Sequence, residues 1–166
     1  GLMAEEEKGG APPRTAEGNG NQADALRRSQ HHVPEPPEIE RAWSLTKALL
    51  TEVARVSRNL NAEPRLVLLP TKEEIAHAAG LGPETPEHID YEAPARRFQE
   101  HCVASGVACL DLTPGFVAAA DRLEELYFPR GGHWTSAGQA VAAEALFQWL
   151  APELCPSPNS PSEQTE

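Results

Sequence analysis

The chain lacks the features that mark nucleic-acid-binding and membrane-spanning proteins. Its 14 Lys and Arg are outnumbered by 25 Asp and Glu, the net charge is −11, and the one basic cluster is the short segment RRSQHH at 27–32. Because binding to phosphates needs a clustered basic face, no nucleic-acid partner is expected. No apolar run approaches the roughly 18 residues of a membrane span, so no transmembrane segment is expected either.

Cysteine is also scarce, and neither a metal nor a cofactor is expected. The cysteines are odd in number and lack a CxxC spacing, which favours buried or idle thiols over a metal or redox site: Cys102, Cys109 and Cys155. No pair of His or carboxylates has metal-ligand spacing. Four histidines are expected to be surface residues: His31, His32, His77 and His101. No signal-peptide pattern opens the sequence, which begins with Gly, so the compartment stays open.

Large apolar residues are nearly absent from both ends of the chain. Residues 1–37 are rich in Gly, Pro, Glu and Asn, and the tail 152–166 has a similar polar composition. Such segments cannot bury enough surface to offset the entropy lost on ordering, so both are expected to be disordered. Residues 38–151 are then expected to form a single folded unit.

Helical and strand patterns alternate along 38–151. Apolar residues recur at helical spacing over 39–60, and two short continuous apolar runs, in EPRLVLLP and VACLDL, are typical of strands buried on both faces. Further helices are expected over 71–82, with a capping box from Thr71 to Glu74, over 93–106 with a stop at Gly106, over 113–128, and over 135–150. This alternation predicts an α/β fold with parallel strands covered by helices.

Two strands are too few for such a sheet. An isolated pair is marginal in water, and buried parallel strands need neighbours on both sides. The sheet is therefore expected to be incomplete, with at least one exposed edge, and the chain is expected either to be marginally stable or to self-associate through that edge.

The loop before the last helix, PRGGHW at 129–134, carries more than a turn requires. Pro129, Gly131 and Gly132 already supply the turn, so His133 and Trp134 are additions. Ligands bind beyond the carboxyl ends of parallel strands, where a loop His suits a general base. Asp111, at the end of the second strand, either joins such a site or caps the following turn through Thr113 and Gly115.

A resemblance to a known family predicts a function for this loop. YFPRGGHWTSAGQAVAAEAL, at 127–146, resembles the last block of the SGNH (GDSL-like) hydrolases, in which an Asp and a His precede a W/P-x-x-x-G-x-x-x-x-A helix. LDLTPGFVAAADRLEELYFP and RAWSLTKALLTEVARVSRNLNAEPRLVLLPTKEEI are similar to the branch related to alginate O-acetyltransferases. The likeness covers about 43–150 and implies the C-terminal half of a three-layer α/β/α, flavodoxin-like fold that acts on acyl esters. It implies His133 as the catalytic base, with Trp134 either packing or stacking on a sugar.

Two parts of that family's catalytic machinery are missing. No Gly-Asp-Ser block carries a nucleophile, and the acid expected before the His falls on Arg130 or Gly131. Loss of the orienting acid alone costs on the order of 10⁴ in rate. Two interpretations stay open: the C-terminal portion of an ester hydrolase or O-acyl (acetyl) transferase, inactive as this chain alone, and a non-catalytic remnant that serves in binding or assembly.

Overall fold

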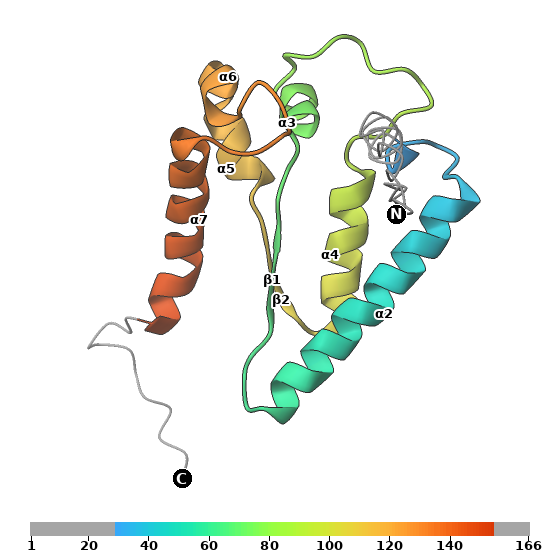
Figure 1. Cartoon of the computed structure of the whole chain (residues 1–166), viewed down its shortest axis with the longest axis vertical. Helices are drawn as coiled ribbons and strands as arrows, with labels where there is room; N and C mark the ends of the chain where they lie inside the picture. Colours follow the sequence, from blue (N-terminus) through green and yellow to red (C-terminus); the bar gives the residue numbers. More distant parts are fainter. Residues whose placement is uncertain (1–28, 155–166) are drawn as a thin grey trace, which may run out of the picture.

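The computed structural model describes residues 29–154, so the expectations for 1–28, for 155–166 and for Cys155 lie outside the described residues. Figure 1 shows three layers, with the strands in the middle, α2 and α4 on one side and α7 on the other. The elements are α2 (Pro37–Asn59), β1 (Arg65–Leu68), α3 (Lys72–Ala78), α4 (Ala93–Ser105), β2 (Ala108–Asp111), α5 (Thr113–Ala118), the 3₁₀ turn η1 (Ala120–Arg122), α6 (Leu123–Leu126) and α7 (Ser136–Leu154). The predicted alternation of helices and strands is confirmed.

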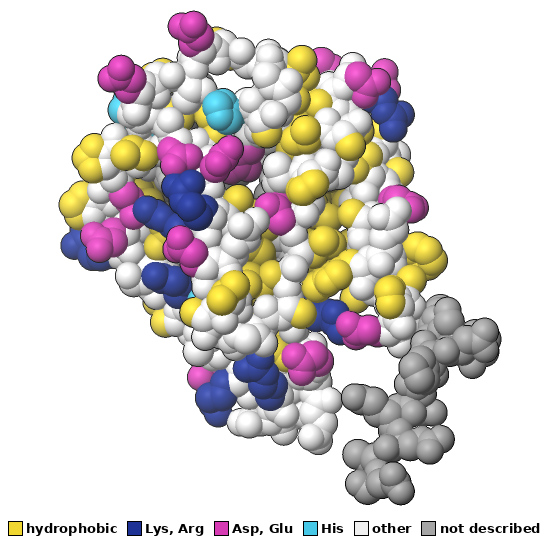
Figure 2. All heavy atoms as spheres, turned by 180° about the vertical axis from the view of Figure 1, so that it is seen from behind, with side chains coloured by type: hydrophobic (Ala, Val, Ile, Leu, Met, Phe, Trp, Pro, Cys, Tyr) yellow, Lys and Arg dark blue, Asp and Glu magenta, His cyan; other side chains and the backbone are white. Residues whose placement is uncertain are grey.

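The sheet within residues 29–154 consists of two parallel strands. β1 pairs with β2 in a register that runs from Arg65 opposite Ala108 to Leu68 opposite Asp111. All four β1 side chains and three of the four in β2 are half-buried, and none is fully buried. Seen from behind, hydrophobic side chains form a band down the middle of the molecule (Figure 2). The fold is therefore a partial α/β fold, and the expectation of strands buried on both faces was wrong because too few neighbours cover them.

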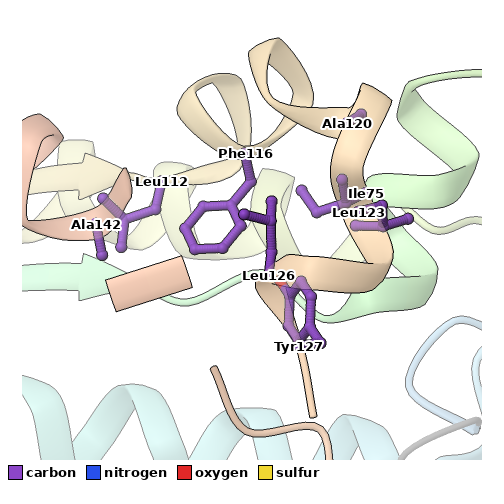
Figure 3. Packing of buried hydrophobic residues seen from close by; sticks show 8 residues of the cluster. All are labelled: Ile75, Leu112, Phe116, Ala120, Leu123, Leu126, Tyr127 and Ala142. Atoms are coloured by element: carbon purple, nitrogen blue, oxygen red, sulfur yellow. The ribbon is translucent and has the colours of Figure 1, made fainter. Parts of the chain in front are cut away.

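The hydrophobic core lies beyond the carboxyl ends of the strands. Helices α3, α5, α6 and α7 meet there, and Figure 3 shows Phe116 among the buried side chains that they contribute. The cluster comprises Ile75, Leu112, Phe116, Ala120, Leu123, Leu126, Tyr127 and Ala142. Leu112 follows β2 directly, so the core anchors the segments that leave the sheet.

Local signals fix two helix ends as the sequence predicts. At the start of α3, the Thr71 hydroxyl accepts a hydrogen bond from the Glu74 N–H (3.2 Å), and the Glu74 carboxylate accepts one from the Thr71 N–H (2.6 Å). This is the predicted capping box. At the end of α4, Gly106 has φ +62°, a left-handed conformation that glycine adopts without steric cost.

Residues 29–36 have fixed partners, so the disordered segment expected to reach residue 37 does not include them. The Val33 N–H donates to the His88 carbonyl (2.8 Å), and the Asp90 N–H donates to the His31 carbonyl (2.7 Å). A polar segment can be ordered in this way because backbone pairing needs no apolar face. At the other end, α7 continues to Leu154, past the expected boundary at 151.

Two histidines and two cysteines also depart from expectation. His31 and His101 are buried, not on the surface as predicted. Cys102 and Cys109 form a disulfide that joins the end of α4 to β2, so they are not idle thiols. Their pairing follows from the tight turn at Gly106, which brings the helix end back beside the strand. Among residues 29–154, no three His, Cys, Asp or Glu side chains are grouped to hold a metal ion.

Candidate functional site

The loop that joins α6 to α7 folds back on itself as a short hairpin. Tyr127 and Trp134 form an antiparallel bridge, and the Phe128 N–H donates to the His133 carbonyl (2.8 Å). At its tip, Gly131 and Gly132 have φ of +87° and +64°. Most side chains are strained in these conformations, so the glycines shape the turn that holds His133.

The base of this hairpin is anchored at the carboxyl end of the sheet. Tyr127 is fully buried, and its hydroxyl donates to the carbonyl of Pro70 (2.9 Å), which lies just beyond the end of β1. Burial raises the pKa of Tyr127 to about 12, and a hydrogen bond from Trp134 acts in the opposite direction. Figure 1 shows the hairpin beside α3, at the same end of the molecule. Open parallel sheets bind ligands at this end.

His133 lies on the exposed side of the hairpin, without a carboxylate partner among the described residues. No ion pair or hydrogen bond joins its ring to an acid within 29–154. The candidate acid Asp111 instead accepts hydrogen bonds from the Thr113 N–H (2.9 Å) and from Gln99 Nε2 (3.2 Å). Asp111 therefore caps its turn, as one of the two interpretations expected, and does not orient the imidazole.

Trp134 points toward the core more than His133 does. Its ring contacts Phe116, with centroids 4.9 Å apart and planes at 33°, and it is half-buried. One face of the indole is therefore used for packing, which favours the packing role over stacking on a sugar.

Gly138 is the position whose importance the sequence reasoning missed. A Cβ added there would lie 2.3 Å from the Leu126 carbonyl oxygen and 3.0 Å from the Trp134 Cβ. The Thr135 hydroxyl donates a hydrogen bond to the Glu125 carbonyl and accepts one from the Gly138 N–H (3.4 Å). These two bonds connect the start of α7 to the end of α6. The glycine in the W-x-x-x-G spacing is the sequence signal for this close approach.

Two shallow grooves on the described surface lie away from the hairpin. One, of about 400 Å³, follows α4 past Arg96 and Val103, and the other, of about 410 Å³, lies between α5 and α7 beside Arg122 and Glu144. Neither groove is lined by His133 or Trp134. None of the helices within 29–154 combines the length and apolar character required to span a bilayer.

Comparison with protein families finds a match over most of the chain. Residues 30–165 match the model of the SGNH hydrolase-like domain of acetyltransferase AlgX. No curated protein and no solved structure matches the chain. The matched range includes α2, both strands and the hairpin with His133, so the resemblance noted in the sequence is confirmed. The chain therefore belongs to the family of SGNH hydrolase-like domains described for acetyltransferase AlgX.

Proposed function

We propose that the chain supplies the C-terminal, base-bearing part of an SGNH-type site that hydrolyses or transfers an acyl ester, with His133 as the general base. The observation that supports the proposal is that His133 is exposed, on a hairpin whose turn is formed by two glycines with positive φ. This hairpin lies beyond the ends of two parallel strands in a chain of this family. The acetyltransferase relationship favours an acetyl ester as substrate, and the O-acetyl ester of a glycan is the form proposed here.

The chemistry requires two groups besides the imidazole. A serine hydroxyl attacks the acyl carbon while Nε2 accepts its proton, and the intermediate then expels the alcohol, which takes that proton. Water or an acceptor hydroxyl next removes the acyl group from the serine, and an acid that binds Nδ1–H orients the ring throughout. Three helical serines do not suit the nucleophile's role, because each hydroxyl donates to a carbonyl one turn earlier: Ser44 to Glu40, Ser57 to Val53 and Ser105 to His101. Ser136, the first residue of α7, follows Trp134 and Thr135 and so lacks the Gly-Asp-Ser setting of the family's nucleophile. Residues 29–154 alone are therefore expected to be inactive.

Arg130 and Gly131 occupy the positions of the missing acid, and they are not equivalent. A Cβ at Gly131 would lie 3.3 Å from His133 Cδ2 and 3.8 Å from Nε2, beside the edge that faces a nucleophile rather than beside Nδ1. Gly131 also has φ +87°, where a side chain is strained. Arg130 carries neither restriction, so Arg130→Asp is the better way to supply an orienting carboxylate.

A non-catalytic role in binding or assembly is the second candidate. It is favoured by the absence of an acid at 130 and 131 and by the large apolar side chains that α2 exposes. Self-association through the sheet edge belongs with this candidate.

Reconstitution would test the catalytic proposal. The chain is co-expressed with the front half of a related SGNH domain that carries its serine block, and saturable hydrolysis of 4-nitrophenyl acetate is measured. Arg130→Asp is expected to raise the rate above that of the wild-type pair, by up to about 10⁴-fold if the ring becomes fully oriented. Gly131→Asp is the matched comparison and is expected to give less. The proposal fails if Arg130→Asp combined with His133→Ala is as active as Arg130→Asp alone.

A further inference from the structure

Four of the six histidines gather where the chain before α2 meets α3 and the loop between α3 and α4: His31, His32, His77 and His88. We call residues 29–36, which hold the first two, the strap. The Tyr91 ring contacts two of these histidines, with its centroid 5.0 Å from that of His31 and 5.0 Å from that of His77. The rings of His32 and His88 meet edge to face, with centroids 5.5 Å apart. The strap therefore meets its neighbours through rings that titrate near neutral pH.

Backbone hydrogen bonds outside the core fix the strap to the loop. The Val33 N–H donates to the His88 carbonyl (2.8 Å), and the Asp90 N–H donates to the His31 carbonyl (2.7 Å). Figure 1 shows the chain that leads into α4 beside the segment that leads into α2. Within residues 29–154, the core cluster draws on 75–142 and includes no residue of the strap. A segment held in this way can open while the core stays folded.

His31 is buried in the strap and is held in its neutral form. Its Nε2 lies 3.3 Å from Gln30 Nε2, and an amide nitrogen can only donate, so the ring nitrogen accepts and carries no proton. Its Nδ1 is buried and has no hydrogen-bond partner among residues 29–154. Protonation of Nε2 would remove the bond from Gln30 and place a charge where burial disfavours it.

Acidic groups face His31 from α3 and from the loop, and they do not offset its burial. Burial is the largest influence on the pKa of His31 and lowers it, whereas Glu74, Asp90 and Glu73 act in the opposite direction. The net effect is a lowered pKa. Glu74 Oε1 lies 3.8 Å from Nε2, which is too far for a hydrogen bond, and Glu74 Oε2 already accepts the Thr71 N–H.

The other charged groups around the strap divide it into two parts. Two charged imidazoles as close as those of His32 and His88 repel each other, which adds to the cost of protonation. Glu35, near the other end of the strap, forms an ion pair with Arg97 of α4. This pair contains no histidine, so it is expected to hold the end of the strap while the part before it opens.

We propose that the strap is an acid-sensitive switch, in which protonation of its histidines, above all His31, releases residues 29–34 from the loop at 86–91 while the core stays folded. Opening hydrates His31 and separates His32 from His88, so the open form binds protons that the closed form excludes. The switch frees the chain before α2 from the end of α3. It does not depend on a catalytic role for His133.

Amide hydrogen exchange followed by NMR would test the switch. If opening binds one proton with a pKa of about 6.5, the opening constant rises about tenfold between about pH 7.5 and pH 5.5. The protection factors of the Val33 and Asp90 N–H groups should fall by about this amount. The reference is the Leu112 N–H, which donates to the Leu68 carbonyl (3.2 Å) beside the core.

Low concentrations of urea separate local opening from global unfolding. Urea should speed exchange at Leu112 and leave Val33 and Asp90 nearly unchanged, because local opening exposes little surface. The proposal is overturned if the strap amides show no fall in protection with pH. It is also overturned if they match Leu112 in both protection and urea response, since the strap would then open only when the whole chain unfolds.

Variants test the assignment to His31. His31→Gln should reduce the fall in protection to about twofold or less. His101→Gln is the matched control, because His101 is also buried with an unpartnered ring nitrogen but lies on α4, and it should keep the full fall. A full fall in His31→Gln would contradict the proposal.

Gln30→Glu decides the case in which His31→Gln opens the strap at every pH. Its carboxylate can accept a hydrogen bond from a protonated Nε2, so the strap should stay closed to a lower pH than in the wild type. A Gln30→Glu variant with the same pH dependence as the wild type would overturn the role of His31.

Discussion

Replacing Gly138 with alanine should destabilise the chain, although alanine is the better helix former. The added Cβ would lie 2.3 Å from the Leu126 carbonyl oxygen, whereas a carbon–oxygen contact needs about 3.3 Å. The start of α7 must therefore move by about 1 Å from the end of α6, against the hydrogen bond from Thr135 N–H to the Leu126 carbonyl (3.0 Å). Overpacking of this kind costs about 1–3 kcal/mol, and helix propensity returns up to about 1 kcal/mol. A net loss of about 2 kcal/mol is expected.

Chemical and thermal unfolding, followed by circular dichroism, would measure this loss. For a folded unit of this size, about 2 kcal/mol corresponds to a fall in Tm of roughly 5–10 °C. Gly115→Ala is the matched control, because a Cβ there meets Val141 Cγ1 at 3.7 Å and Ala145 Cβ at 4.0 Å, which are ordinary contacts. It should be neutral or stabilising. A Gly138→Ala variant as stable as wild type would refute the close approach of α7 to α6.

Three further substitutions probe other parts of the structure. Replacing Cys102 and Cys109 with alanine should lower the free energy of unfolding by about 2.5 kcal/mol, because the disulfide closes a short loop, and an unchanged denaturation midpoint on reduction would contradict this. Burial lowers the pKa of His31, so the folded state binds fewer protons than the unfolded state just below pH 6.5. The contribution of His31 to the free energy of unfolding is therefore complete above pH 6.5 and is lost as the pH falls below that value. His31→Gln should make the free energy of unfolding less dependent on pH below 6.5, and an unchanged pH dependence would contradict this. Tyr127→Phe removes the bond to the Pro70 carbonyl and should cost about 1–2 kcal/mol in urea unfolding, and a cost near zero would argue against that bond.

Much of the fold could be predicted because its signals are local. The capping box of Thr71 and Glu74, the left-handed Gly106 and the two apolar runs each depend on a few adjacent residues. The incomplete sheet followed from counting strands. The positions of the loop glycines followed from turn chemistry, and both have positive φ.

The features that were mispredicted depend on contacts between distant segments. Residues 29–36 are ordered by backbone bonds to 88–90, and nothing in their own composition indicates that pairing. His31 is buried by contacts with Tyr91 and Glu74, far along the chain. Gly138 belongs to the motif noted in the sequence, but a glycine is required there because the carbonyl of Leu126, on a different helix, leaves no room for a Cβ. Non-local contacts of this kind leave no periodic signal in the sequence.

The central claim is that His133 lacks both a nucleophile and an orienting acid within the described chain. The most direct test is saturable hydrolysis of 4-nitrophenyl acetate by the purified chain and by its His133→Ala variant, since saturation separates a formed site from diffuse catalysis by exposed imidazoles. The account predicts no saturable rate in either protein. A saturable rate that disappears with His133→Ala would contradict it, because the chain would then contain a working nucleophile.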